Sequence, residues 1–262
     1  MKYGFLGCGN MGGAIARAVA RSTNEILIAD RSGKAQALAD ELGVEYASSR
    51  KVATECERIF LAVKPQMMAE AICPIREILQ QRKPILITMA AGLTMRTISD
   101  IVGEPIPIIR IMPNTPVAIG TGMTVYCYND LVSNTILKDF LCDMSATGRM
   151  DQLPENLIDA ASALSGSGPA YLYMFIEAMA DGAVLCGIPR AKALEYAAAT
   201  IAGAAQLMLE GGQHPAVLKD AVCSPGGSTI AGLRVLENHS FRGIVMECIS
   251  AAYHRNKELG KK

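Results

Sequence analysis

The pattern G-x-G-x-x-G at residues 7–12 limits the fold of this 262-residue chain more than any other feature. It follows a short apolar run at residues 3–6 and opens a stretch whose apolar residues recur at helical spacing. In a strand-turn-helix setting, Gly7 allows the tight turn, Gly9 lets the backbone approach a pyrophosphate, and Gly12 lets the helix pack on the strand. The pattern predicts a dinucleotide site at the start of the first helix, and a glycine turn that binds no nucleotide is the alternative.

Short apolar runs alternate with segments of helical period over the first 150 residues. The expected strands are residues 3–6, 25–29, 58–63, 84–89, 106–111, 122–128 and 147–150. The expected helices between them are residues 11–20, 35–42, 67–80, 94–102 and 131–144. This alternation predicts an α/β fold with an N-terminal, Rossmann-type doubly wound parallel sheet, which we assign to residues 1–152.

Residues 153–262 lack β-branched runs and consist of alanine-rich segments with helical period, so we expect a C-terminal all-helical domain. The segment 191–209 is almost uncharged and should therefore be buried on more than one face. Because the domain is small, we expect a second subunit to cover this helix. The alternative is a central helix in a monomeric bundle.

Residues 30–32 follow the second expected strand, where dinucleotide sites distinguish NAD from NADP. Asp30 would accept hydrogen bonds from the ribose hydroxyls of NAD. Arg31 and the Ser32 hydroxyl would instead bind the 2′-phosphate of NADP. Both kinds of residue are present, so these residues alone leave the choice open.

Several other loops carry residues suited to a ligand. Small, polar or proline-rich residues follow later strands at 62–65, 89–92 and 112–116, and ligands of open α/β sheets lie at such strand ends. Residues 224–229 place glycines and hydroxyls before a helix, which makes a row of N–H groups suited to a carboxylate. An ordinary helix N-cap explains the same residues.

Composition excludes several classes of function. The 25 basic and 25 acidic side chains balance, so we expect no nucleic-acid partner. Eight separated cysteines and three histidines predict neither a disulfide framework nor a metal site. The longest uncharged run, at 111–129, contains two prolines, so we expect no membrane span and a cytoplasmic protein. No histidine has sequence neighbours that would tune it as a catalytic acid or base.

Five motifs, in this order, resemble the pyrroline-5-carboxylate reductase family: GCGNMG at 7–12, AVKP at 62–65, RIMPNTP at 110–116, SGSGPAY at 165–171 and DAVCSPGGSTI at 220–230. The resemblance covers nearly the whole chain. It implies reduction of 1-pyrroline-5-carboxylate to L-proline, the last step of proline biosynthesis, by hydride transfer from NADPH, with NADH possible. It also implies a helical domain, residues 153–262, that binds substrate and joins a homodimer, which some members extend to a homodecamer.

The same resemblance implies roles for single residues. The Thr229 hydroxyl would hydrogen-bond the ring nitrogen of the substrate as the catalytic group, and Glu155 would lie near the substrate. The substrate carboxylate would rest on the N–H groups of Gly227, Ser228 and Thr229. The residues expected to hold the cofactor are Gly7, Cys8, Gly9, Asn10, Met11, Gly12, Arg31, Ser32, Ala62, Val63, Lys64, Pro65 and Ala91. Ser228 and Asp30 depart from the family pattern.

Two other functions are compatible with parts of the sequence. A β-hydroxyacid dehydrogenase shares the plan of a Rossmann domain followed by helices, but residues 169–180 contain no lysine, which that chemistry uses as its acid-base group. A module that senses NADP without turnover would keep only the cofactor site. Imine-dependent oxidation of NADPH separates an imine reductase from both.

Overall fold

The computed structural model describes residues 1–30 and 33–259. Contacts divide the chain into two units, Met1–Ser167 with Ala251–Lys262, and Gly168–Ser250. Residues 153–167 belong to the sheet unit by contacts because Ile158 is buried with Met112, Val125 and Cys127. The domain boundary after residue 152 stays a prediction, since a division by contacts does not test which part folds independently.

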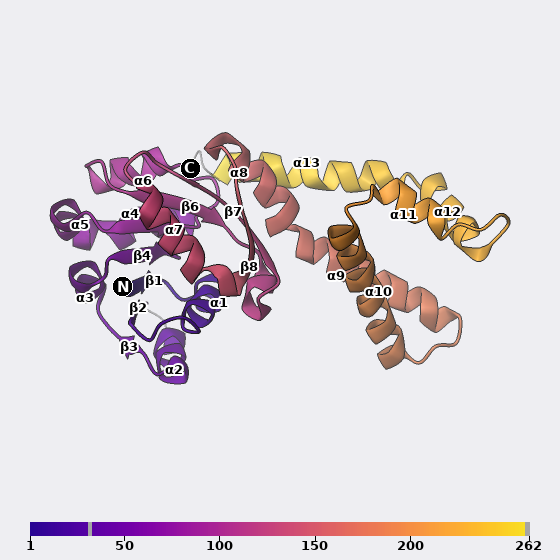
Figure 1. Ribbon diagram of the computed structural model, residues 1–262, viewed down its shortest axis with the longest axis horizontal. Helices are drawn as coiled ribbons and strands as arrows, with labels where there is room; N and C mark the ends of the chain where they lie inside the picture. Colours follow the sequence, from indigo (N-terminus) through magenta and orange to yellow (C-terminus); the bar gives the residue numbers. More distant parts are fainter. Residues whose placement is uncertain (31–32, 260–262) are drawn as a thin grey trace. The chain divides into compact units, whose positions relative to one another are not determined.

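The first unit is built on an eight-stranded sheet with the order β3-β2-β1-β4-β5-β6-β7-β8 (Figure 1). The strands are β1 (Tyr3–Leu6), β2 (Ile26–Ala29), β3 (Glu45–Tyr46), β4 (Arg58–Leu61), β5 (Ile85–Thr88), β6 (Ile108–Met112), β7 (Gly122–Tyr128) and β8 (Gly148–Gln152). Neighbouring strands are parallel except β6 and β7, so the predicted doubly wound Rossmann-type sheet is confirmed. β7 reverses because only a short 3₁₀ helix, η3 (Thr115–Ile119), joins it to β6, and a parallel return needs a longer crossover.

Helices cover both faces of this sheet. One face is covered by α1 (Asn10–Val19), α2 (Gly33–Leu42) and α7 (Asn134–Asp143). The other is covered by α3 (Ser49–Glu55), α4 (Met68–Ile72), α5 (Arg76–Arg82) and α6 (Met95–Val102). The single helix predicted at 67–80 is wrong, because Pro74 lies in a 3₁₀ turn, η2 (Cys73–Ile75), between α4 and α5. α8 (Glu155–Ala161) runs on into a π-helix, η5 (Ser162–Gly166).

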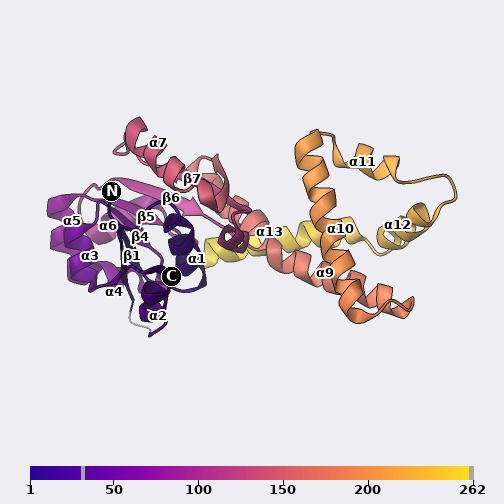
Figure 2. The same cartoon turned by 60° about the horizontal axis from the view of Figure 1, so that its bottom comes forward.

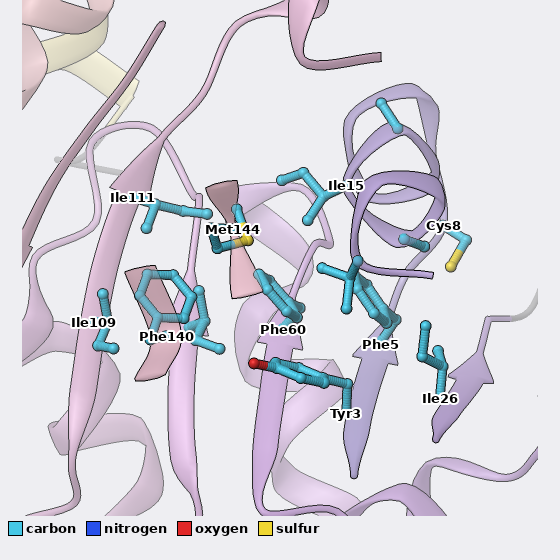
Figure 3. Packing of buried hydrophobic residues seen from close by; sticks show 14 of the residues in the cluster. Tyr3, Phe5, Cys8, Ile15, Ile26, Phe60, Ile109, Ile111, Phe140 and Met144 are labelled. Carbon is cyan, nitrogen blue, oxygen red and sulfur yellow. The ribbon is translucent and has the colours of Figure 1, made fainter. Parts of the chain in front are cut away.

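Alternate side chains of the central strands fill two cores. Tyr3 and Phe5 of β1 and Phe60 of β4 enter the core shared with α1 and α7 (Figure 3). The Phe5 and Phe60 rings stack with centroids 4.5 Å apart. Ile59 and Leu61 enter the core on the opposite face. Burial on both faces explains why these strands read as nearly continuous apolar runs.

The second unit is entirely helical, as predicted (Figure 2). It contains α9 (Gly168–Leu185), α10 (Arg190–Gly211), α11 (Pro215–Ala221), α12 (Ser228–Asn238) and the first half of α13 (Phe241–Leu259). α9 and α10 pack against each other. Among the described residues of this unit, only Ala180, Ala193 and Ala197 are buried in the single chain. The helix predicted at 191–209 therefore exposes most of its apolar surface, which contradicts the alternative of a central helix in a monomeric bundle.

A buried charge cluster ties α7 to the N-terminal ends of β1 and β4. The fully buried Arg58 guanidinium pairs with Asp143 at 2.5 Å and donates to the Tyr3 hydroxyl, which itself donates to Asp143. Burial and the hydrogen bond to Asp143 raise the pKa of Tyr3, so the phenol stays protonated. Asp139 lies 3.9 Å from the same guanidinium but is more exposed.

Asp143→Ala is expected to lower the free energy of unfolding by about 3 kcal/mol, because it leaves the buried Arg58 charge without its close partner. Asp139→Ala is the matched control, and its effect is expected to stay under about 1 kcal/mol because that carboxylate is 46% exposed and makes a long contact. Urea denaturation at one protein concentration measures both. Equal losses in the two variants would contradict the assignment.

Candidate active site

A cavity of about 670 Å³ opens where β1, β2 and β4 end. This volume lies in the range of small-molecule sites. Five residues predicted to hold a cofactor line it, namely Gly7, Gly9, Ala62, Val63 and Lys64. The carboxyl ends of neighbouring parallel strands thus converge on one cavity, as expected for a ligand site in an open α/β sheet.

The glycine loop at 7–12 leaves no room for side chains at two of its three glycines. Gly7 has φ +93°, and a Cβ there would lie 2.8 Å from the Ala62 carbonyl oxygen. A Cβ on Gly12 would lie 2.7 Å from the Gly7 oxygen and 2.8 Å from the Ala62 Cβ. A Cβ on Gly9 would meet no described atom within 4 Å, and Gly9 is exposed beside the cavity. Gly7 and Gly12 therefore serve close packing, whereas Gly9 leaves open space beside the cavity.

The loop is fixed by Asp30, the residue after β2. Its Oδ2 accepts a hydrogen bond from the Cys8 N–H at 2.6 Å, and its carbonyl oxygen accepts one from the Tyr46 hydroxyl at 2.6 Å. The Cys8 thiol is buried, and desolvation with the nearby Asp30 charge raises its pKa to about 12. Cys8 is therefore a protonated packing residue, and its backbone N–H is its polar contribution to the loop. Asn10 and Met11 begin α1, Asn10 exposed and Met11 partly buried.

The predicted 2′-phosphate residues Arg31 and Ser32 lie outside the described residues. Pro65 starts the 3₁₀ helix η1 (Pro65–Met67), directly after the cavity residue Lys64. Ala91 is partly buried in the loop after β5 and packs against the apolar cluster of Met112 and Ile158. The predicted cofactor residues of the described chain thus gather at the carboxyl ends of β1, β4 and β5.

Glu155 lies in the first turn of α8. Its Oε1 accepts from the Met95 N–H at 2.6 Å and lies 3.5 Å from Arg110 Nη1. Met95 and Arg110, both in the same unit, therefore already bind the Glu155 carboxylate.

The start of α12, in the second unit, has the backbone geometry of an anion site. Gly226 adopts φ +69°, and Gly227 is the extended N-cap residue. No described side chain caps the helix, and Ser228 and Thr229 are exposed at its first two positions. The Gly227 N–H donates to the Ser224 carbonyl oxygen at 3.0 Å, whereas the N–H groups of Ser228 and Thr229 have no acceptor within the helix and could bind a carboxylate.

Part of the cavity wall was not predicted from the sequence. Residues 46–49 and 67–74 supply Tyr46, Ala47, Ser48, Ser49, Met67, Glu70, Ala71 and Pro74. β3 is only two residues long, too short to show a strand pattern. Ser48 did carry a signal, because serine before a helical segment is a typical N-cap, and its Oγ accepts from the Lys51 N–H.

Known proteins match the chain along nearly its whole length. The pyrroline-5-carboxylate reductase of Escherichia coli (strain K12) is 40% identical over 266 residues, which cover 99% of this chain and 98% of that protein. The chain belongs to the pyrroline-5-carboxylate reductase family. The reductase of the same name from Synechocystis is 41% identical over 272 residues, covering 100% of this chain and 99% of the relative.

Family models and a solved structure agree with this membership. The model described as pyrroline-5-carboxylate reductase dimerisation matches residues 155–259, and one described as NADP oxidoreductase, coenzyme F420-dependent, matches residues 2–92. The structure of Plasmodium falciparum pyrroline carboxylate reductase with NADP bound has a TM-score of 0.91 and 32% identity, covering 99% of this chain and 98% of that one. The resemblance inferred from the five motifs is confirmed.

Within the described residues, the histidines, cysteines and carboxylates form no group of three or more that could hold a metal ion. None of the described helices is both long and apolar enough to span a membrane.

Gly12→Ala is expected to weaken NADPH binding at least tenfold, because its Cβ would force α1 away from Gly7 and Ala62. Gly13→Ala is the matched control, since its Cβ would meet only ordinary contacts, the nearest at 3.4 Å. Quenching or enhancement of NADPH fluorescence measures the dissociation constants. Unchanged affinity in Gly12→Ala would show that helix packing at this glycine does not govern the site.

Proposed function

We propose that this chain reduces 1-pyrroline-5-carboxylate to L-proline, the last step of proline biosynthesis, with NADPH as the reductant and NADH as a possible one. The observation that carries the proposal is the glycine-lined cavity at the strand ends, in a chain that matches its reductase relatives over 99% of its length. In the reaction the imine nitrogen gains a proton, a hydride adds to the carbon of the resulting iminium bond, and the product is a secondary amine.

The chain's own residues fit the cofactor. The open space at Gly9 and the N-terminus of α1 would receive the pyrophosphate. Ala62, Val63 and Lys64, with Pro65 and Ala91, would lie along the ribose and nicotinamide, which supplies the hydride when bound. Arg31 and Ser32 would select the 2′-phosphate. The hydrogen bond of Asp30 to the glycine loop supports a role for this carboxylate in the protein rather than at an NAD ribose.

The uncapped start of α12 supports the proposed substrate cradle. The N–H groups of Ser228 and Thr229 would hold the substrate carboxylate, and the Thr229 hydroxyl would orient the ring nitrogen or relay a proton from water. Gly227, whose N–H donates to the Ser224 carbonyl oxygen, would shape the turn before the helix. A cyclic imine is protonated far more readily than a ketone, so the site needs no strong protein acid. Positioning would supply most of the catalysis.

Neither alternative function has a specific observation in its favour. A β-hydroxyacid dehydrogenase needs a lysine that residues 169–180 do not contain. A module that only senses NADP would need no anion site for a substrate, whereas the start of α12 has the geometry of one.

Self-association through the helical unit belongs to the same proposal. Its apolar side chains are widely exposed in the single chain, with Leu185 at 89% and Met246 at 72%. Apolar surface on this scale marks an interface, and the dimerisation model matches the same region. A dimer is the smallest assembly that covers it. Assembly into a decamer and a cytoplasmic location stay predictions.

Wild-type protein is expected to oxidise NADPH only when 1-pyrroline-5-carboxylate is added, as followed by absorbance of the reduced nicotinamide. Thr229→Ala is expected to lose about 100-fold in kcat while NADPH affinity is retained, because the hydroxyl acts on the imine and not on the cofactor. Thr229→Ser, which keeps a hydroxyl, is the control. Full turnover in Thr229→Ala would remove this residue from the mechanism.

Sedimentation equilibrium is expected to give a mass of at least twice the 27.8 kDa chain at micromolar concentration, because the exposed apolar faces of α9–α13 need a cover. A monomer under these conditions would contradict the proposed dimer. Addition of NADPH should leave the mass unchanged, since the proposed interface lies outside the cofactor cavity.

A further inference from the structure

A buried ionic cluster lies beside the loop that carries Ala91. Arg110 of β6 is 1% exposed and pairs with two carboxylates of α8, Asp159 at 2.6 Å and Glu155 at 3.5 Å. Strand register places Arg110 opposite Thr88, the last residue of β5. The loop at residues 89–94 leaves the sheet from that point, so its first residue follows directly on the neighbour of Arg110.

Glu155 also reaches the far end of this loop. Its Oε1 accepts the hydrogen bond from the Met95 N–H at 2.6 Å, and Met95 is the first residue of α6. A carboxylate at this position satisfies an N–H that has no partner within the helix and complements the helix dipole. The loop is thus fixed at one end by β5 and at the other by Glu155.

Apolar contacts also connect this loop to α8. Ala91, within the loop, and Met95, just after it, pack against a cluster whose buried members include Met112 of β6 and Ile158 of α8. Gly92 turns the backbone between them with φ +76°. The position of Ala91 therefore depends on α8 through both a polar and an apolar contact.

We propose that Glu155 is a positioning residue for hydride transfer: aligned by Arg110, it holds Met95 and so sets the Ala91 loop against the nicotinamide side of the cofactor site. The inference rests on the proposed function. It gives Glu155 a role through Met95 in place of the direct substrate contact that the family resemblance implies. The ion pair of Asp159 with Arg110 holds the guanidinium beside Glu155 and does not involve the loop.

Two variants of Glu155 separate these roles. Glu155→Ala removes the acceptor for the Met95 N–H, whereas Glu155→Gln keeps a side-chain oxygen for it and loses the charge. Glu104→Ala is the matched control, because Glu104 lies just beyond the other end of α6 in a surface pair with Lys83 at 3.6 Å. Amide hydrogen exchange of residues 89–96, NADPH affinity, and kcat and KM for the imine are measured for each.

For Glu155→Ala we expect exchange in 89–96 to rise about tenfold, as one charge-assisted hydrogen bond is lost. Its kcat should fall tenfold or more because the nicotinamide side is displaced, while KM for the imine and NADPH affinity change less than about threefold. Glu155→Gln and Glu104→Ala should stay within about threefold of wild type in every measurement.

Other outcomes overturn the inference. A large rise in the imine KM in both Glu155 variants, with exchange unchanged, would place the carboxylate on the substrate. Raised exchange with normal kcat would show that the loop position does not limit hydride transfer. Should Glu155→Ala fail to fold, Glu155→Asp, which withdraws the carboxylate from Met95, is read by the same criteria. A wild type without imine-dependent turnover defeats the proposed function, and the exchange data still decide whether Glu155 holds the loop.

Discussion

The close approach of α1 to the carboxyl ends of β1 and β4 is the constraint on which the rest of the structure depends. It exists because Gly7 and Gly12 have no Cβ, and either Cβ would lie within 3 Å of the Ala62 segment or of the loop itself. The approach sets the cavity between β1, β2 and β4 and aims the first N–H groups of α1 toward it. Asp30 then locks the loop through the Cys8 N–H. The proposed cofactor site therefore rests on backbone geometry, and the Asp30 carboxylate holds that backbone.

The proposed chemistry likewise relies on backbone groups and on placement. Two carboxylates near the proposed sites hold loops: Asp30 holds the glycine loop, and Glu155 holds the start of α6. The proposed substrate cradle at α12 is again a row of backbone N–H groups. Reduction of an easily protonated imine suits such a site, because correct placement of two molecules supplies most of the barrier reduction.

Sequence reasoning reached the features that depend on local pattern. The G-x-G-x-x-G pattern predicted the turn and its helix, because Gly7 and Gly12 each answer a local steric demand. The reversal of β7 and the split at Pro74 were missed, since the first depends on the length of a connection and the second on one residue within a helical period. Contacts between distant segments left no local signal: the Asp30 bond to Cys8 spans 22 positions, and that of Glu155 to Met95 spans 60. Arg31 and Ser32, which bear on cofactor choice, lie outside the described residues.

The central claim is that the glycine loop binds a dinucleotide and that the start of α12 binds the substrate carboxylate, both through backbone N–H groups. A structure of the assembled protein with NADP⁺ and L-proline tests it most directly. The account predicts the pyrophosphate beside Gly9 at the start of α1 and the proline carboxylate on the N–H groups of Ser228 and Thr229. Either ligand bound away from these N–H groups would contradict it.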